Sequence, residues 1–156
     1  MITKALQTLL LHRWGHLLDF DHERLSKERL QLFADVIHDR RAPLTTCWGF
    51  IDGTIYQIAR PIWFQKGCYN GWKQKHCVKY YAMVSPHGII CHLYGPVEGR
   101  QNDAHLFNKS GLWQYLQTYF FGEDEQLLQI YGDPAYGVSA HLLSLFKCAQ
   151  ITLQQQ

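Results

Sequence analysis

Three aspartates stand at points where the 156-residue chain is expected to change direction. Asp52 and Asp133 each follow a short apolar run and come directly before a turn-forming residue, glycine in one case and proline in the other. Asp103 stands where a helix is expected to begin. If the two apolar runs are neighbouring parallel strands, their carboxyl ends face one crevice, which makes Asp52 and Asp133 neighbours and lets Asp103 lean toward them.

Three carboxylates in one crevice repel one another and partly protonate unless a cation neutralises them. Carboxylate oxygens are hard ligands that suit Mg²⁺ or Mn²⁺. An ion held by Asp52, Asp103 and Asp133, with water and phosphate oxygens in the rest of its shell, can activate an attacking hydroxyl and stabilise a leaving oxygen. The sequence therefore predicts that these three residues are catalytic and metal-ligating, although each of them singly could equally form a turn or cap a helix.

The elements that would position these aspartates follow from the apolar spacing. Helical periodicity over 2–18 and 26–39 predicts two N-terminal helices, so residues 1–45 are expected to form a helical extension that covers the domain. Residues 46–156 then read as strand, hairpin, helix, strand and helix, which predicts an α/β fold. The expected elements are a strand over 47–51 that ends at Asp52, a hairpin of 78–84 and 89–94, a helix from Asp103 that restarts at Ser110, a strand over 127–131 and a helix over 139–149.

Composition narrows the class of protein further. Apolar residues make up 47% of the chain and charged residues 18%, which excludes an intrinsically disordered protein. The net charge of +2 is too small to mark the whole chain as nucleic-acid-binding, so that property must be local. The five cysteines are odd in number and scattered, and no apolar run approaches the ~20 residues of a membrane span or resembles a signal peptide. An intracellular protein with reduced thiols is expected.

Positive charge and aromatic rings concentrate in the stretch from Gly53 to Tyr80. It contains no Asp or Glu and five cations, which are Arg60, Lys66, Lys73, Lys75 and Lys79. Rings such as Trp72 can stack on unpaired bases at roughly 1–3 kcal/mol each, while Lys and Arg neutralise phosphates. These five cations and Trp72 are therefore predicted to bind DNA. In the alternative interpretation, Trp63 and Phe64 pack into the core and the lysines form an ordinary solvated face.

Five short motifs occur in order over about residues 47–146. They are WGFIDGT at 48–54, RP at 60–61, YNGWKQKH at 69–76, VEGRQND at 97–103 with SGL at 110–112, and GDPAY at 132–136. Together they resemble the DDE endonuclease domain of PIF/Harbinger-type transposases. The order of the five makes the resemblance specific, although each motif is short.

This resemblance implies an RNase H-like fold, in which a mixed sheet flanked by helices carries acidic metal ligands. Carried over by motif, Asp52 is the ligand on the first strand, Asp133 the ligand on the fourth strand and Asp103 an additional acid between them. The resemblance also implies Mg²⁺ or Mn²⁺ as cofactor, DNA as substrate, a nuclear location and a separate Myb-like DNA-binding protein as a partner.

The chain departs from the family pattern at two places. Asn102 stands where the family often has His. The family's last acid is a Glu on a helix well downstream of the Asp133 position, and no Glu follows Glu125 here. Residues 46–156 are therefore expected to be an endonuclease domain that is incomplete at the C-terminus, binds a metal and cleaves poorly.

Two rival interpretations stay open. A non-catalytic DNA-binding or scaffold protein domesticated from a transposase would explain the missing Glu. An unrelated hydrolase acting on a small phosphate ester would use the same carboxylates but would not need the basic, aromatic segment.

Overall fold

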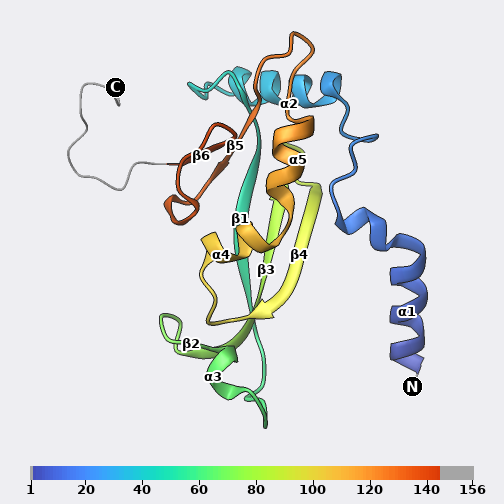
Figure 1. Cartoon of the computed structure of the whole chain (residues 1–156), viewed down its shortest axis with the longest axis vertical. Helices are drawn as coiled ribbons and strands as arrows, with labels where there is room; N and C mark the ends of the chain where they lie inside the picture. The colour runs from blue at the N-terminus through green and yellow to red at the C-terminus, as the bar shows by residue number, and fades with distance from the viewer. Residues whose placement is uncertain (1, 145–156) are drawn as a thin grey trace, which may run out of the picture.

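The computed structural model describes residues 2–144, which form one mixed sheet with helices packed on it (Figure 1). The helices are α1 (Ile2–Trp14), η1 (Gly15–Leu18), α2 (Lys27–Asp39), α3 (Gln65–Cys68), α4 (Asp103–Lys109), α5 (Leu112–Tyr119) and η2 (Pro134–Tyr136). The strands are β1 (Cys47–Gln57), β2 (Tyr69–Asn70), β3 (Lys75–Val84), β4 (Ile90–Glu98), β5 (Gln129–Gly132) and β6 (Leu142–Ser144). The mixed sheet with flanking helices confirms the predicted RNase H-like α/β class.

The centre of the sheet is β1, which pairs with a strand of each direction. It runs antiparallel to β3 on one side and parallel to β5 on the other, in the order β2-β3-β1-β5-β6, and β4 pairs with β3. The predicted hairpin of β3 and β4 and the predicted parallel pairing of the first strand with the strand before Asp133 are both confirmed.

One face of the sheet carries the core. Along β3 the buried residues alternate, and they are Cys77, Lys79, Tyr81 and Met83. This period of two puts all four side chains on the same face. Helices α2, α4 and α5 pack on that face, where Trp48 of β1 lies edge-on to Phe120 at 4.8 Å between ring centroids. The helices therefore define which side of β1 an acidic residue of α4 can reach.

Two of the expected elements differ in the structure. The first strand does not end at Asp52 but continues to Gln57, because β3 pairs with it through Gln57↔Cys77. The helix expected over 139–149 is wrong where the structure describes it, since Leu142–Ser144 form β6 and pair in parallel with β5. Residues 145–149 lie outside the described part. A short apolar run does not distinguish a buried strand from a helix by its periodicity.

The N-terminal helices were predicted correctly as elements, but α1 does not cover the sheet, whereas η1 packs on β4 and α2 packs on β1. Helix α2 buries Leu30, Phe33, Ala34 and Ile37 and packs on β1. Helix α1 projects away from the body of the molecule (Figure 1), and its leucines Leu6, Leu9, Leu10 and Leu11 are each at least half exposed. Within residues 2–144, no helix is both long enough and apolar enough to cross a membrane.

Candidate active site

Asp52 and Asp133 are placed by the parallel pairing of β1 with β5. The last register pair of these strands is Ile51↔Gly132, so the two aspartates are the next residues on neighbouring strands. Both residues are exposed. The neighbouring positions that the sequence predicts for these two acids therefore follow from the register.

Each of these two carboxylates is oriented by a nearby backbone amide. The N–H of Gly53 donates to Asp52 Oδ1 at 2.7 Å, and the N–H of Ala135 donates to Asp133 Oδ1 at 2.7 Å. Asp133 is thereby the N-cap of η2, whose first residue is Pro134, as expected for an acid before a helical turn. Each carboxylate keeps its second oxygen for another partner.

Asp103 comes to the same region from the other layer, at the first turn of α4. The N-cap of this helix is Asn102 rather than Asp103, because the Asn102 side chain accepts the N–H of His105 at 2.8 Å. A Cβ built on Gly53 would lie only 3.0 Å from Asp103 Oδ1. The missing side chain at Gly53 therefore lets the Asp103 carboxylate lie against β1 on the Gly53 side.

The hydroxyl of Tyr136 lies within the field of all three aspartates. It would lie 3.3 Å from a Cβ on Gly53, and within the described residues this buried oxygen has no hydrogen-bond partner. Burial raises the pKa of Tyr136 far above its usual value, and the charges of Asp103, Asp52 and Asp133 raise it further. This hydroxyl stays protonated, and the charges of all three acids act on it.

The three acids nevertheless form no closed ligand set. Within residues 2–144 there is no group of three His, Cys, Asp or Glu side chains placed to hold one metal ion. Asp52 and Gly53 are consecutive strand residues with opposed side-chain directions, and Asp103 lies on the Gly53 side. Carboxylates fit Mg²⁺ or Mn²⁺ chemically, and Mg²⁺ in proteins is often held by only one or two of them with water and phosphate oxygens. Asp52 and Asp133 fit that mode of binding.

Lys79 is placed differently from the other cations predicted to bind DNA. It is only 7% exposed, and its Nζ donates to Asp103 Oδ1 at 3.1 Å. The alternation of β3 turns this residue toward the core face, so its charge faces the acidic site and is not free on the surface.

The remaining basic, aromatic residues lie on the surface at the end of the sheet that carries α3 and β2. Arg60, Lys66, Lys73, Lys75 and Trp72 are exposed. Trp63 is 77% and Phe64 85% exposed, so the alternative that these two rings pack into the core is wrong. Lys73 and Lys75 line an open groove of about 540 Å³ whose wall also includes Gly53. The groove therefore runs from exposed lysines to the residue against which Asp103 packs.

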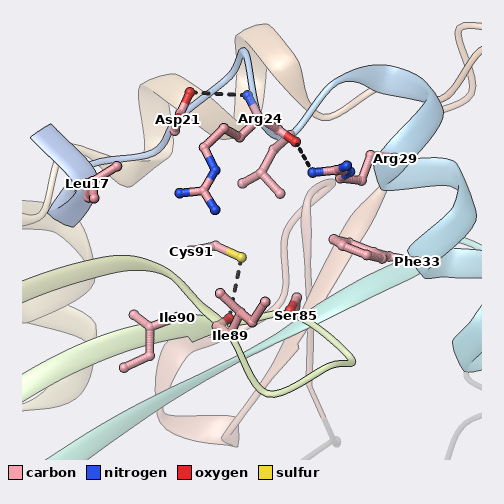
Figure 2. Close-up of a pocket in the computed structure, with 10 residues that line it drawn as sticks. Leu17, Asp21, Arg24, Arg29, Phe33, Ser85, Ile89, Ile90 and Cys91 are labelled. Carbon is pink, nitrogen blue, oxygen red and sulfur yellow. Dashed lines mark hydrogen bonds between the residues drawn. The ribbon is translucent and has the colours of Figure 1, made fainter.

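A second cavity, of about 80 Å³, lies between the N-terminal segment and the turn that joins β3 to β4 (Figure 2). Its lining includes Arg24, Arg29 and Cys91, and burial raises the pKa of the Cys91 thiol. Arg29 donates to the carbonyl oxygen of Arg24 at 3.1 Å. None of the three aspartates lines this cavity, and it is too small for a polynucleotide.

The fold and the acids together define an RNase H-like α/β domain with carboxylates beside its central parallel strands. A family model described as DDE superfamily endonuclease matches residues 51–156, and the chain belongs to this family. The match begins one residue before Asp52 and includes Asp103 and Asp133. No curated protein and no solved structure matches the chain.

Sequence reasoning took Gly53 only as a turn-forming residue, which is wrong because β1 continues through it, and it gave Tyr136 no role. Both lie inside motifs that it had found, IDGT and GDPAY. A glycine directly after a strand acid is a signal of close backbone approach. No comparable signal marks Tyr136, because its hydroxyl reaches the acids only through the turn of η2.

Proposed function

We propose that the chain is a divalent-metal-dependent DNA endonuclease domain of the transposase type, acting on phosphodiester bonds. The observation that carries the proposal is the register pair Ile51↔Gly132, which makes Asp52 and Asp133 the next residues on two neighbouring parallel strands. Two carboxylates at neighbouring positions on adjacent strands suit one Mg²⁺ or Mn²⁺ ion together with water and a DNA phosphate. Membership of the DDE superfamily endonucleases supports the same chemistry.

Each residue of the site has a distinct role in this proposal. Asp52 and Asp133 hold the ion through the oxygens that the backbone amides leave free, and Asp103 contributes negative charge from the helix layer. When bound, the ion supplies activation of the attacking hydroxyl and stabilisation of the leaving oxygen. Arg60, Lys66, Lys73 and Lys75 neutralise phosphates, and the exposed Trp72 stacks on bases.

The finer assignment to the PIF/Harbinger type is part of the proposal. It is supported by the order of the five motifs, from WGFIDGT to GDPAY. A nuclear location and a Myb-like partner belong to the same assignment, because a DNA-cleaving domain acts where its DNA is and its groove offers no base-reading helix of its own among the described residues.

The test measures Mn²⁺ binding by electron paramagnetic resonance and nicking of supercoiled plasmid in Mn²⁺. Wild type is expected to bind Mn²⁺ and to nick slowly, because the acids of the site suffice for one ion and not for the pair used in two-metal cleavage. Asp52→Asn and Asp133→Asn are expected to abolish both signals. Asp124→Asn, an exposed acid in the turn before β5, is the matched control and should change neither.

Absence of Mn²⁺ binding by the folded wild type would contradict the proposal. The domesticated, non-catalytic alternative predicts DNA binding that Asp52→Asn leaves intact, with no nicking at all. Rapid nicking by wild type that is lost in Asp133→Asn would mean that a further residue completes a two-ion site.

A further inference from the structure

Lys79 is a cation in a row of buried residues. Its neighbours on the same face of β3 are Cys77 and Tyr81, both 0% exposed, while Lys79 itself is 7% exposed. Burying an ammonium among such neighbours is costly unless a counter-charge lies beside it. An ammonium at this buried position therefore requires a charged partner, and the structure supplies one acid.

That partner is Asp103, whose Oδ1 accepts the Lys79 Nζ proton at 3.1 Å. The Asp103 side chain is 31% exposed and that of Lys79 9%, so the pair is screened by water much less than a surface pair. By contrast, the other ion pair of the described residues, between Lys27 and Glu125, lies on the surface with side chains 44% and 72% exposed.

The pair depends on the absence of a side chain at Gly53. Lys79 lies opposite Ile55 in the register, and Gly53 lies opposite Tyr81, two residues further along β3. A Cβ on Gly53 would lie 3.0 Å from Asp103 Oδ1, so the glycine gives this carboxylate room to lie against β1 without a shift. Helix α4 thus places the Asp103 carboxylate beside the Lys79 ammonium.

The geometry points to Lys79 as a built-in counter-ion that occupies the cation position at Asp103 and so limits the site to one divalent ion, held by Asp52 and Asp133. This inference rests on the proposed metal-dependent function. Three carboxylates against one ammonium leave two negative charges, which one Mg²⁺ or Mn²⁺ neutralises. A second divalent ion at Asp103 would lie beside the Lys79 ammonium and be repelled by it. Lys79 is therefore a positioning residue for Asp103, not a contact for a DNA phosphate.

The experiment is a double-mutant cycle on Lys79 and Asp103, in which the Mn²⁺ affinity of the full chain is measured by titration without DNA. Lys79→Met removes the ammonium and is expected to tighten Mn²⁺ binding by about tenfold or more, because the competing charge is gone. Asp103→Asn is expected to weaken it. The double variant removes one charge of each sign, so the two effects should offset each other and the Mn²⁺ affinity should return to within about threefold of wild type. Lys79→Arg keeps the charge and should keep the wild-type affinity, and Lys4→Met, at an exposed position in α1, is the matched control.

Unchanged or weaker Mn²⁺ binding by folded Lys79→Met would overturn the inference. A double variant that loses Mn²⁺ binding would also overturn it, because Asp103 would then be a direct ligand. If Lys79→Met does not fold, Lys79→Gln takes its place.

A second measurement, urea unfolding without metal, separates this inference from the proposed function. It compares wild type, Lys79→Met, Asp103→Asn and the double variant. Each single variant should lower the midpoint and the double variant should recover most of the loss, because an unpaired buried charge costs more than an absent pair. Additive losses would overturn the counter-ion role even if wild type binds Mn²⁺. Recovery in the double variant would support the pairing even if wild type binds none, in which case only the metal-dependent function fails.

Discussion

Gly53 is the residue whose lack of a side chain matters most to the acidic site. Gly53→Ala places a methyl group 3.0 Å from Asp103 Oδ1 and 3.3 Å from the Tyr136 hydroxyl. Overpacking of this kind costs about 1–3 kcal/mol, and the nearest atom here is a carboxylate already held by Lys79. We expect a lower midpoint of urea unfolding. Gly71→Ala, where nothing lies within 4 Å of the added Cβ, is the control, and equal midpoints for the two variants would contradict the close approach.

Tyr136 offers a prediction of the opposite sign. Its hydroxyl is buried, has no partner among the described residues and is surrounded by three negative charges. Removing an unsatisfied buried polar group is neutral or stabilising, whereas removing a bonded one costs about 1 kcal/mol. Tyr136→Phe should therefore leave the free energy of unfolding unchanged or raise it. A loss near that size in urea unfolding would mean that the hydroxyl donates a hydrogen bond in solution.

At the scale of elements, β4 carries a buried histidine whose titration couples to folding. His92 is 1% exposed, and within residues 2–144 neither of its ring nitrogens has a hydrogen-bond partner. Burial lowers its pKa, an effect that the charge of Asp19 partly opposes. Below about pH 6.5 the unfolded chain binds a proton that the folded chain does not, so stability falls as the pH drops from there to the lower folded pKa. Above that window His92 has no effect on the pH dependence.

The corresponding variant is His92→Phe, which keeps an aromatic ring beside Tyr81. It should flatten the fall in unfolding free energy between pH 7.5 and 5, and His141, whose pKa burial also lowers, should retain its own share. His105→Gln, at an exposed position in α4, is the control. An identical slope for wild type and His92→Phe would assign the acid sensitivity to other groups.

The basic, aromatic segment around α3 and β2 predicts salt-dependent DNA binding. Each phosphate contact adds about 0.9 to the slope of log affinity against log salt concentration, so Lys73→Ala with Lys75→Ala should lower that slope by up to twice this amount. Trp72→Ala should weaken binding to single-stranded DNA with little change in the slope. Lys4→Ala with Lys109→Ala, both exposed and outside the segment, is the control. An unchanged slope in the Lys73 and Lys75 variant would make these lysines an ordinary solvated face.

At the scale of the whole molecule, stability is expected to be uneven. Helix α1 projects from the body and leaves Leu9 68% and Trp14 49% exposed, whereas α2 buries one face on the sheet (Figure 1). An isolated helix of 13 residues is marginal in water. Amide hydrogen exchange of the full chain should therefore show weak protection in α1 and strong protection in α2 and β3. Equal protection of α1 and α2 would mean that something covers the α1 leucines in solution.

The sequence alone was enough to predict the class of fold and the order of the main elements up to β5, while the role of the three acids stays a prediction. Apolar runs before Asp52 and Asp133 have the length of strands, and turn-forming residues stand where the hairpin and the loops occur. These signals depend on residues that are close together in the sequence, so they do not require knowledge of the tertiary contacts. The motifs that support family membership can be found in the same way, because each of them is a contiguous stretch of residues.

Only the tertiary structure decided where the strands end and which side chains of the acidic site are in contact. Periodicity could not tell that β1 continues past Asp52, because that depends on its pairing with β3, nor that the run at Leu142 pairs with β5 as a strand. It could not tell that Lys79 turns inward to Asp103 while Lys75, four residues earlier, is exposed. Both lysines lie on the same face of β3, but α4 brings Asp103 to Lys79 whereas Lys75, at the strand end, is left exposed. Which part of a strand face is covered depends on contacts between residues distant in the sequence.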